Sequence, residues 1–174
     1  IYELARTADV FLTNYLPNQR QKMKFDIEHI RTVNPKIIYA RGSAYGDKGP
    51  ERDTGGFDGT AFWSRSGIGY TMTPEELGGP LAQAIPAFGD SIGGMNIAGG
   101  IAAALFHRAR TGEAVELDVS LLSTAWWASG TSIDIGLDTG KVLRNRMPQS
   151  GGNPGNPLAG NYRTSDGGTI NLCI

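Results

Sequence analysis

The segment that decides the fold is Ala8–Arg41, which reads ADVFLTNYLPNQRQKMKFDIEHIRTVNPKIIYAR. Its two ends, Ala8–Leu12 and Lys36–Arg41, are short and strongly apolar, as is typical of buried strands. Between them, Asp26 is suited to cap a helix that runs to about Val33 and stops at Asn34-Pro35. A strand, a loop, a helix and a second strand in this order predict an α/β fold built on a sheet.

The remaining elements follow towards the C-terminus. The strongest is a helix over Ser91–Thr111, which is apolar nearly all round until Phe106 and turns basic before Gly112. The other predicted segments are a helix over Phe57–Gly67, a long loop over Gly69–Pro86, a strand over Ala114–Val119, a helix over Leu121–Leu137, a Gly/Pro-rich linker over Lys141–Pro157, and a hairpin of Asn161–Thr164 with Thr169–Ile174.

The composition excludes several classes of protein. The 174 residues carry 16 Lys and Arg against 17 Asp and Glu, so neither a nucleic-acid surface nor a polybasic membrane patch is expected. The 25 glycines, about twice normal usage, lie among periodic apolar blocks and so do not indicate disorder. The single cysteine, Cys173, excludes an internal disulfide and suits a reducing compartment. The chain starts at Ile1 and shows no signal peptide or membrane-spanning apolar run, which leads us to expect an internal piece of a larger cytoplasmic protein.

Asp90 is the strongest candidate for chemistry, in the sequence FGDSIGG at the start of the predicted main helix. One interpretation makes Asp90 the N-cap of that helix, since aspartate is among the commonest caps. The other makes it a nucleophile, because a carboxylate can attack a carbonyl group when nearby amides stabilise the oxyanion. Gly89 and the Gly93-Gly94 pair would leave room for a thioester to approach. The two interpretations are compatible.

Gly-Asp-Ser also raises the alternative of a serine hydrolase with Ser91 as nucleophile. Such an enzyme needs a histidine base, and the chain has only His29 and His107. His107 falls on the same predicted helix, about 24 Å from Ser91 at the usual rise per residue. Neither histidine is therefore a good base. No phosphate-binding Gly-x-x-x-x-Gly-Lys loop or zinc-ligand spacing is present either, and we predict no metal site.

Taken together, these segments resemble the family III coenzyme A transferases over practically the whole chain. The motifs that carry the resemblance are Ala8–Pro17 (ADVFLTNYLP), Asn34–Arg41 (NPKIIYAR), Tyr45–Pro50 (YGDKGP), Gly89-Asp90-Ser91 with its long helix, and Arg110–Glu113 (RTGE). The resemblance implies that residues 1–138 are the central part of a large Rossmann-like α/β domain. Residues 139–174 would be a linker and the start of a small domain. Members of the family resemble open rings with long linker helices. Two such chains interlock, so the resemblance also implies a homodimer.

The resemblance further implies an acyl-CoA:carboxylate CoA-transferase. Acyl-CoA and a carboxylic acid would be its substrates, with no tightly bound cofactor and no nucleic-acid or membrane partner. Asp90 matches the catalytic aspartate, which becomes an acyl anhydride and then an aspartyl-CoA thioester. The residues that match CoA-contacting positions are Asn14, Tyr15 and Leu16 in the turn after the first strand, Lys22 and Met23 beside the nucleotide end, and Gly56, Phe57, Asp58 and Gly59 along the thioester pocket.

One departure from the family narrows the activity. The racemases of the family carry a histidine of their acid/base pair where this chain has Phe57, so transfer is favoured over racemisation. An acyl-CoA racemase or isomerase stays the alternative, as does a non-catalytic CoA- or partner-binding relative in which Asp90 is only a cap. Four aromatic residues are consistent either with an apolar acyl pocket or with core packing: Phe57, Phe62, Trp63 and Tyr70.

Overall fold

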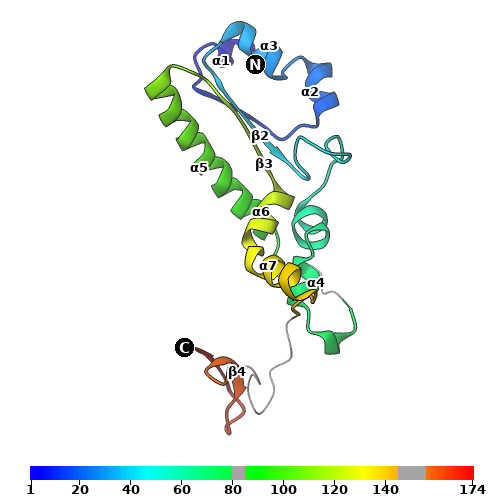
Figure 1. Ribbon diagram of the computed structural model, residues 1–174. Helices are drawn as coiled ribbons and strands as arrows, with labels where there is room; N and C mark the ends of the chain where they lie inside the picture. Colours follow the sequence, from blue (N-terminus) through cyan, green and yellow to red (C-terminus); the bar gives the residue numbers. More distant parts are fainter. Residues whose placement is uncertain (80–84, 145–155) are drawn as a thin grey trace.

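A three-stranded parallel sheet forms the centre of the computed structural model, which describes residues 1–79, 85–144 and 156–174. Its strands β1 (Val10–Thr13), β2 (Ile38–Ser43) and β3 (Glu116–Ser120) lie in the order β1-β2-β3. Val10 pairs with Ile38 and Tyr39 with Glu116, so the carboxyl ends of all three strands meet at one edge. The strands and the α/β class predicted from the sequence are confirmed (Figure 1).

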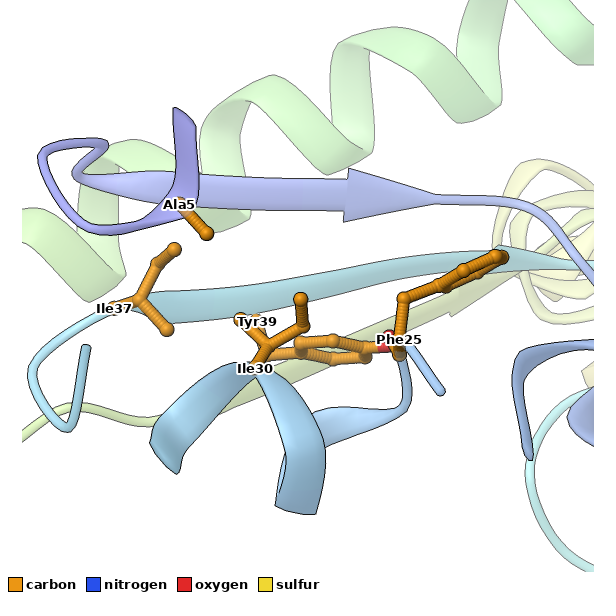
Figure 2. Packing of buried hydrophobic residues seen from close by; sticks show 5 residues of the cluster. All are labelled: Ala5, Phe25, Ile30, Ile37 and Tyr39. Carbon is orange, nitrogen blue, oxygen red and sulfur yellow. The ribbon is translucent and has the colours of Figure 1, made fainter. Parts of the chain in front are cut away.

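One face of the sheet is covered by short helices from the first 33 residues: α1 (Tyr2–Ala5), α2 (Pro17–Met23) and α3 (Ile27–Val33). Figure 2 shows the core on this side, where Ala5, Phe25, Ile30, Ile37 and Tyr39 pack together. The helix predicted after Asp26 is present, and the Asp26 carboxylate caps it by accepting a hydrogen bond of 3.1 Å from the backbone N–H of His29.

The long helix α5 (Phe88–Thr111) covers the opposite face, over β2 and β3 (Figure 1). Successive residues of a strand point to opposite faces, so Ile38, Ala40 and Gly42 face α5 while Tyr39 faces α3. A Cβ at Gly100 would lie 2.7 Å from the side chain of Leu117, which shows how closely α5 approaches β3.

A second apolar cluster lies beyond the carboxyl edge of the sheet. It joins the π-helical segment η1 (Asp58–Arg65), α4 (Ile68–Met72) and α6 (Leu121–Ala128) through the buried residues Phe62, Trp63, Ile68 and Ala125. Two predictions are wrong in this region. The predicted loop after Gly69 contains α4 and the short helix η2 (Glu75–Leu77), and the predicted helix over Leu121–Leu137 breaks at Ser129 into α6 and α7 (Gly130–Thr139).

Trp126 and Trp127 of α6 do not belong to the core. Both are exposed, Trp127 to 85 %. The contacts of α6 with the second apolar cluster come from Ala125 and Leu121, and Leu122 is buried as well. Residues three and four apart share a helix face whereas adjacent ones do not, so packing of Leu122 and Ala125 turns Trp127 outwards.

The C-terminal part forms the predicted hairpin, in which β4 (Ala159–Arg163) pairs antiparallel with β5 (Thr169–Cys173). Most of the predicted linker falls on residues 145–155, outside the described residues. Arg144 lies just before them. In the structure its guanidinium donates to the backbone carbonyl of Thr73 and lies 4.3 Å from the ring centroid of Tyr70.

None of the helices in the described ranges has the length and apolar character needed to cross a bilayer.

Candidate functional site

A cleft of about 1240 Å³ opens at the carboxyl ends of the three strands, beside the start of α5. Ligands of open parallel α/β sheets bind at this edge, because the loops that follow the strands converge there. Six of the ten predicted site residues line the cleft: Asn14, Tyr15, Leu16, Gly56, Phe57 and Asp90. The structure places the other four away from its wall: Lys22, Met23, Asp58 and Gly59.

Asp90 lies in the first turn of α5, and its prediction as an N-cap is wrong. The cap position belongs to Ala87, which adopts the left-handed conformation with φ 55° and makes no side-chain cap hydrogen bond. The helix begins earlier than predicted because the Phe88 ring packs against two buried aromatic residues, with its centroid 6.1 Å from that of Phe62 and 5.9 Å from that of Trp63. The Asp90 side chain is therefore exposed to the cleft rather than used to close the helix.

Asp58 lies beside Gly89, the residue before Asp90, and is 5 % exposed. Its Oδ2 accepts a hydrogen bond of 3.0 Å from the indole N–H of Trp63, while Oδ1 is buried without a hydrogen-bond partner in the described part of the chain. Gly89 packs so closely here that an added Cβ would meet the Phe62 ring and Asp58 Oδ1. Partial burial raises the pKa of Asp90, and the negative charge of Asp58 raises it further.

The surroundings of Asp90 suit attack on a bulky electrophile. The first amides of α5 have no acceptor within the helix, and they give its N-terminus a partial positive charge that can stabilise an oxyanion. Gly93 and Gly94 line the cleft one turn further on, and an added Cβ at Gly94 would meet nothing within 4 Å. The site therefore combines an accessible carboxylate, backbone donors and open space above the helix.

The serine-hydrolase alternative finds no support in this geometry. The Ser91 hydroxyl donates to the backbone carbonyl of Ala87 at 2.9 Å. His29 makes a 2.7 Å contact with Asp26 on α3, and His107 lies near the far end of α5, so neither histidine lines the cleft. A serine nucleophile at this position would lack a base.

The turn after β1 provides the opposite wall of the cleft. The Thr13 hydroxyl accepts a hydrogen bond of 3.2 Å from the backbone N–H of Tyr15, and the Tyr15 ring packs edge-on against Phe25 at 5.4 Å. Leu16 occupies the N-cap position of α2, where its backbone carbonyl accepts hydrogen bonds from Gln19 and Arg20. Asn14, Tyr15 and Leu16, three of the nine residues predicted to contact CoA, thus lie in one turn at the edge of the sheet.

Arg20 was not predicted as a site residue, yet it lines the cleft where Lys22 does not. Residues two apart on a helix point to nearly opposite sides, so α2 cannot direct both cations to the same place. Lys22 and Met23 lie on the exposed side, whereas Nε of Arg20 is buried and has no hydrogen-bond partner among the described residues. The basic residues of α2 indicated that a cation would be near the ligand, but the way α2 packs determines which of them faces the cleft.

A charged cluster centred on Arg41 was also missed. Its guanidinium lies 3.4 Å from the carboxylate of Asp47, 3.5 Å from that of Glu116 and 3.4 Å from that of Asp118. Ser43 donates a further hydrogen bond of 3.3 Å to Asp118. Burial raises the pKa of Asp118, and the positive charge of Arg41 offsets only part of that rise. The position of Arg41 and Asp118 near the ends of predicted strands was the available signal, since parallel strands bring such ends together.

The described residues hold no group of three or more His, Cys, Asp or Glu side chains arranged to bind a metal ion. The cleft brings the Asp90 carboxylate at the start of α5 together with three arginines, Arg20, Arg41 and Arg52.

Comparison with known proteins places the chain in a family. The sequence model of CoA-transferase family III matches residues 1–174. The chain is 35 % identical over its whole length to (R)-2-hydroxy-4-methylpentanoate CoA-transferase of Clostridioides difficile, of which it covers 42 %. It is 32 % identical, again over its whole length, to cinnamoyl-CoA:phenyllactate CoA-transferase of Clostridium sporogenes, of which it covers 41 %. A crystal structure of a CAIB/BAIF family protein from Brucella suis matches with a TM-score of 0.79 and 27 % identity over 95 % of this chain and 42 % of that one.

Proposed function

Since the chain belongs to CoA-transferase family III, we propose that it carries the nucleophile of an enzyme that moves CoA from an acyl-CoA to a carboxylic acid. The observation that carries the proposal is the position of Asp90, which is exposed to a large cleft in the first turn of α5 instead of capping that helix. The chain spans about 42 % of the curated relatives it matches. The activity is therefore proposed for the protein that contains it.

The reaction needs no redox step or external base. The Asp90 carboxylate attacks the thioester carbonyl, a C–O bond forms, the C–S bond breaks, and CoA leaves as a thiolate while a mixed anhydride remains on Asp90. The thiolate then attacks the aspartyl carbonyl, which releases the first carboxylate and leaves an aspartyl-CoA thioester. The acceptor carboxylate displaces the thiolate to form a second anhydride. Attack of the thiolate on the new acyl group yields the product and restores Asp90.

The raised pKa of Asp90 fits this sequence of steps. A carboxylate of higher pKa is a better nucleophile towards a thioester and a poorer leaving group from the anhydride. The shift is upward from the ordinary pKa of aspartate, and its causes are partial burial and the neighbouring charge of Asp58. The amides at the start of α5 would stabilise the negative charge that develops on the carbonyl oxygen in each step.

CoA and its contacts form part of the same proposal. The turn of Asn14, Tyr15 and Leu16 forms one wall of the cleft, and guanidinium groups suit the phosphates of CoA. Lys22 and Met23 are exposed on α2 outside the cleft. A ligand bound in the cleft would contact them only if its nucleotide end extended over the surface of α2. We assign them to the nucleotide end of CoA on the family resemblance alone.

The acyl groups of the two curated relatives guide the choice of substrate. Their names specify a branched and an aryl 2-hydroxy acid, both with an apolar side chain. We infer a substrate of the same class, an apolar 2-hydroxy acid and its CoA thioester.

We further propose a cytoplasmic homodimer of interlocked chains with a domain boundary near residue 138. Exposed apolar side chains of α6 and α7, Trp127 and Leu137 among them, are consistent with additional protein surface against these helices.

The test is to trap the intermediate in the full-length protein. After incubation with an acyl-CoA, hydroxylamine should leave a hydroxamate on Asp90 that is detected by peptide mass spectrometry. Asp90→Asn should lose the adduct and at least about a thousandfold of the transfer rate. The matched control is Asp134→Asn, an exposed aspartate on α7 outside the cleft, which should behave as the unchanged protein.

Full activity in Asp90→Asn, or an adduct on another residue, would overturn the proposal. A racemase would instead exchange the α-hydrogen of the acyl group with solvent deuterium without forming an adduct. Phe57 offers no ionisable group at the position of the racemase histidine, so we expect no such exchange.

A further inference from the structure

The four aromatic residues that the sequence grouped as a possible acyl pocket have different surroundings in the structure. Phe62 and Trp63 are buried in the cluster with α6, at 1 % and 5 % exposure. The Tyr70 ring is covered by Arg144 and does not line the cleft. Phe57 alone of the four lines the cleft, and it is 81 % exposed. Core packing thus accounts for two of the four, and it does not account for Phe57.

The backbone of Phe57 is fixed although its ring is exposed. Its N–H donates a hydrogen bond of 2.8 Å to the hydroxyl of Thr60, and that hydroxyl lies 3.1 Å from the Phe57 carbonyl. On one side Asp58 is buried. On the other, Gly56 passes so close to Ala44 that an added Cβ would lie 2.9 Å from the Ala44 Cβ. An apolar ring that lines a cleft offers surface that gains free energy when a ligand's apolar group covers it.

The same cleft supplies apolar side chains from other elements. Ile97 of α5, Val119 of β3 and Leu121 of α6 all line it, together with Phe57 and the nucleophile Asp90. An acyl group bound to Asp90 would therefore share the cleft with apolar side chains from three further elements. The other aromatic residue of the lining, Tyr15, is already packed against Phe25 on the far side of the sheet edge.

We propose that the Phe57 ring contacts the apolar side chain of the acyl group carried by Asp90, and thereby selects aryl and branched acyl groups over short ones. This inference rests on the proposed CoA transfer and adds a specificity-determining residue to it. The fixed backbone keeps the ring available without a rearrangement, so most of the burial free energy goes to the ligand. Hydrophobic pockets discriminate by about ten- to two-hundredfold per methylene group.

The experiment compares donors in the full-length protein. The values of kcat/KM for 3-phenylpropanoyl-CoA and 4-methylpentanoyl-CoA are divided by that for acetyl-CoA in the unchanged protein, in Phe57→Ala and in Phe57→Leu. We expect Phe57→Ala to lower both ratios at least about tenfold and Phe57→Leu to restore most of the branched but not the aryl preference. Phe106→Ala is the matched control, because Phe106 is 65 % exposed on α5 and does not line the cleft.

Two outcomes would overturn the inference while leaving the proposed function intact. The first is active transfer with ratios that stay within twofold in Phe57→Ala. The second is an equal loss of kcat/KM for all donors together with a lower melting temperature, which would mean that the ring packs against protein rather than substrate. Absence of transfer by the unchanged protein with every donor would refute the proposed function itself, and the inference with it.

Discussion

Replacing Gly89 by alanine is the sharpest test of the way the nucleophile is held. A methyl group at Gly89 would lie 2.5 Å from Cδ2 of Phe62, and closer still to Cγ of that ring and to Oδ1 of Asp58. Carbon atoms normally approach to about 3.5 Å. Phe62 and Asp58 are both buried, so neither can swing into solvent to make room. The added methyl group must therefore displace the first turn of α5, which carries Asp90.

Two opposing effects set the magnitude. Alanine is favoured over glycine inside a helix by about 1 kcal/mol, which taken alone would stabilise the protein. Overpacking of a well-filled core costs about 1–3 kcal/mol. We expect a cost near the upper end of this range, because the added methyl group would overlap with both a buried ring and a buried carboxylate. We expect the clash to win, with a net loss of about 1–2 kcal/mol in the free energy of unfolding. We also expect a loss of transfer rate larger than this instability explains.

The assay pairs urea unfolding of Gly89→Ala with the rate of CoA transfer. Gly99→Ala is its control, because Gly99 lies in the same helix and an added Cβ there would meet nothing within 4 Å. That variant should gain about 0.5–1 kcal/mol from helix propensity and keep its activity. The reasoning is refuted if Gly89→Ala is as stable and as active as Gly99→Ala.

Two further predictions concern charge. The negative charge of Asp58 helps to raise the pKa of Asp90, and the nucleophile must be ionised to react. Asp58→Asn should therefore move the acidic limb of the pH–rate profile to lower pH, while the amide oxygen of the new side chain still accepts the hydrogen bond from Trp63. An acidic limb that does not move would contradict this prediction. Arg41→Met leaves the partly buried Asp118 without its cation and should lower the free energy of unfolding by about 2 kcal/mol at pH 7, less than for a fully buried pair. The loss should shrink as the pH falls and Asp118 becomes neutral, and equal urea midpoints at pH 7 would count against it.

Elements with a strong local signal were predicted correctly. Asp26 is followed by a short amphipathic run, and it caps α3 as expected because a cap depends only on residues three positions apart. The hairpin of β4 and β5 likewise depends on the turn at Ser165–Gly168. By contrast, the break at Ser129 was missed although Ser129-Gly130 is a dipeptide typical of turns, because the apolar pattern continues across it. There the direction of the helix changes after α6 has packed against η1.

The start of α5 shows why a local rule can fail beside a site. Aspartate is among the best N-caps, and Asp90 precedes a long apolar helix, so the rule placed it at the cap. In the structure the aromatic contacts of Phe88 extend the helix back to Ala87, a residue poorly suited to the role. Packing between distant segments thus overrode a capping preference of about 1 kcal/mol. The result is a carboxylate that is free to face the cleft.

The sequence by itself determined the α/β class, the strands, the main helix and Asp90 as the residue most suited to covalent chemistry, because these depend on patterns within a few residues. Only the tertiary structure decided which side chains meet at the cleft. It directs Arg20 inwards and Lys22 outwards, and it leaves Phe57 exposed while Phe62 is buried. The physical reason is that side-chain direction follows from the face by which each element packs, and that face is chosen by partners far away in the chain.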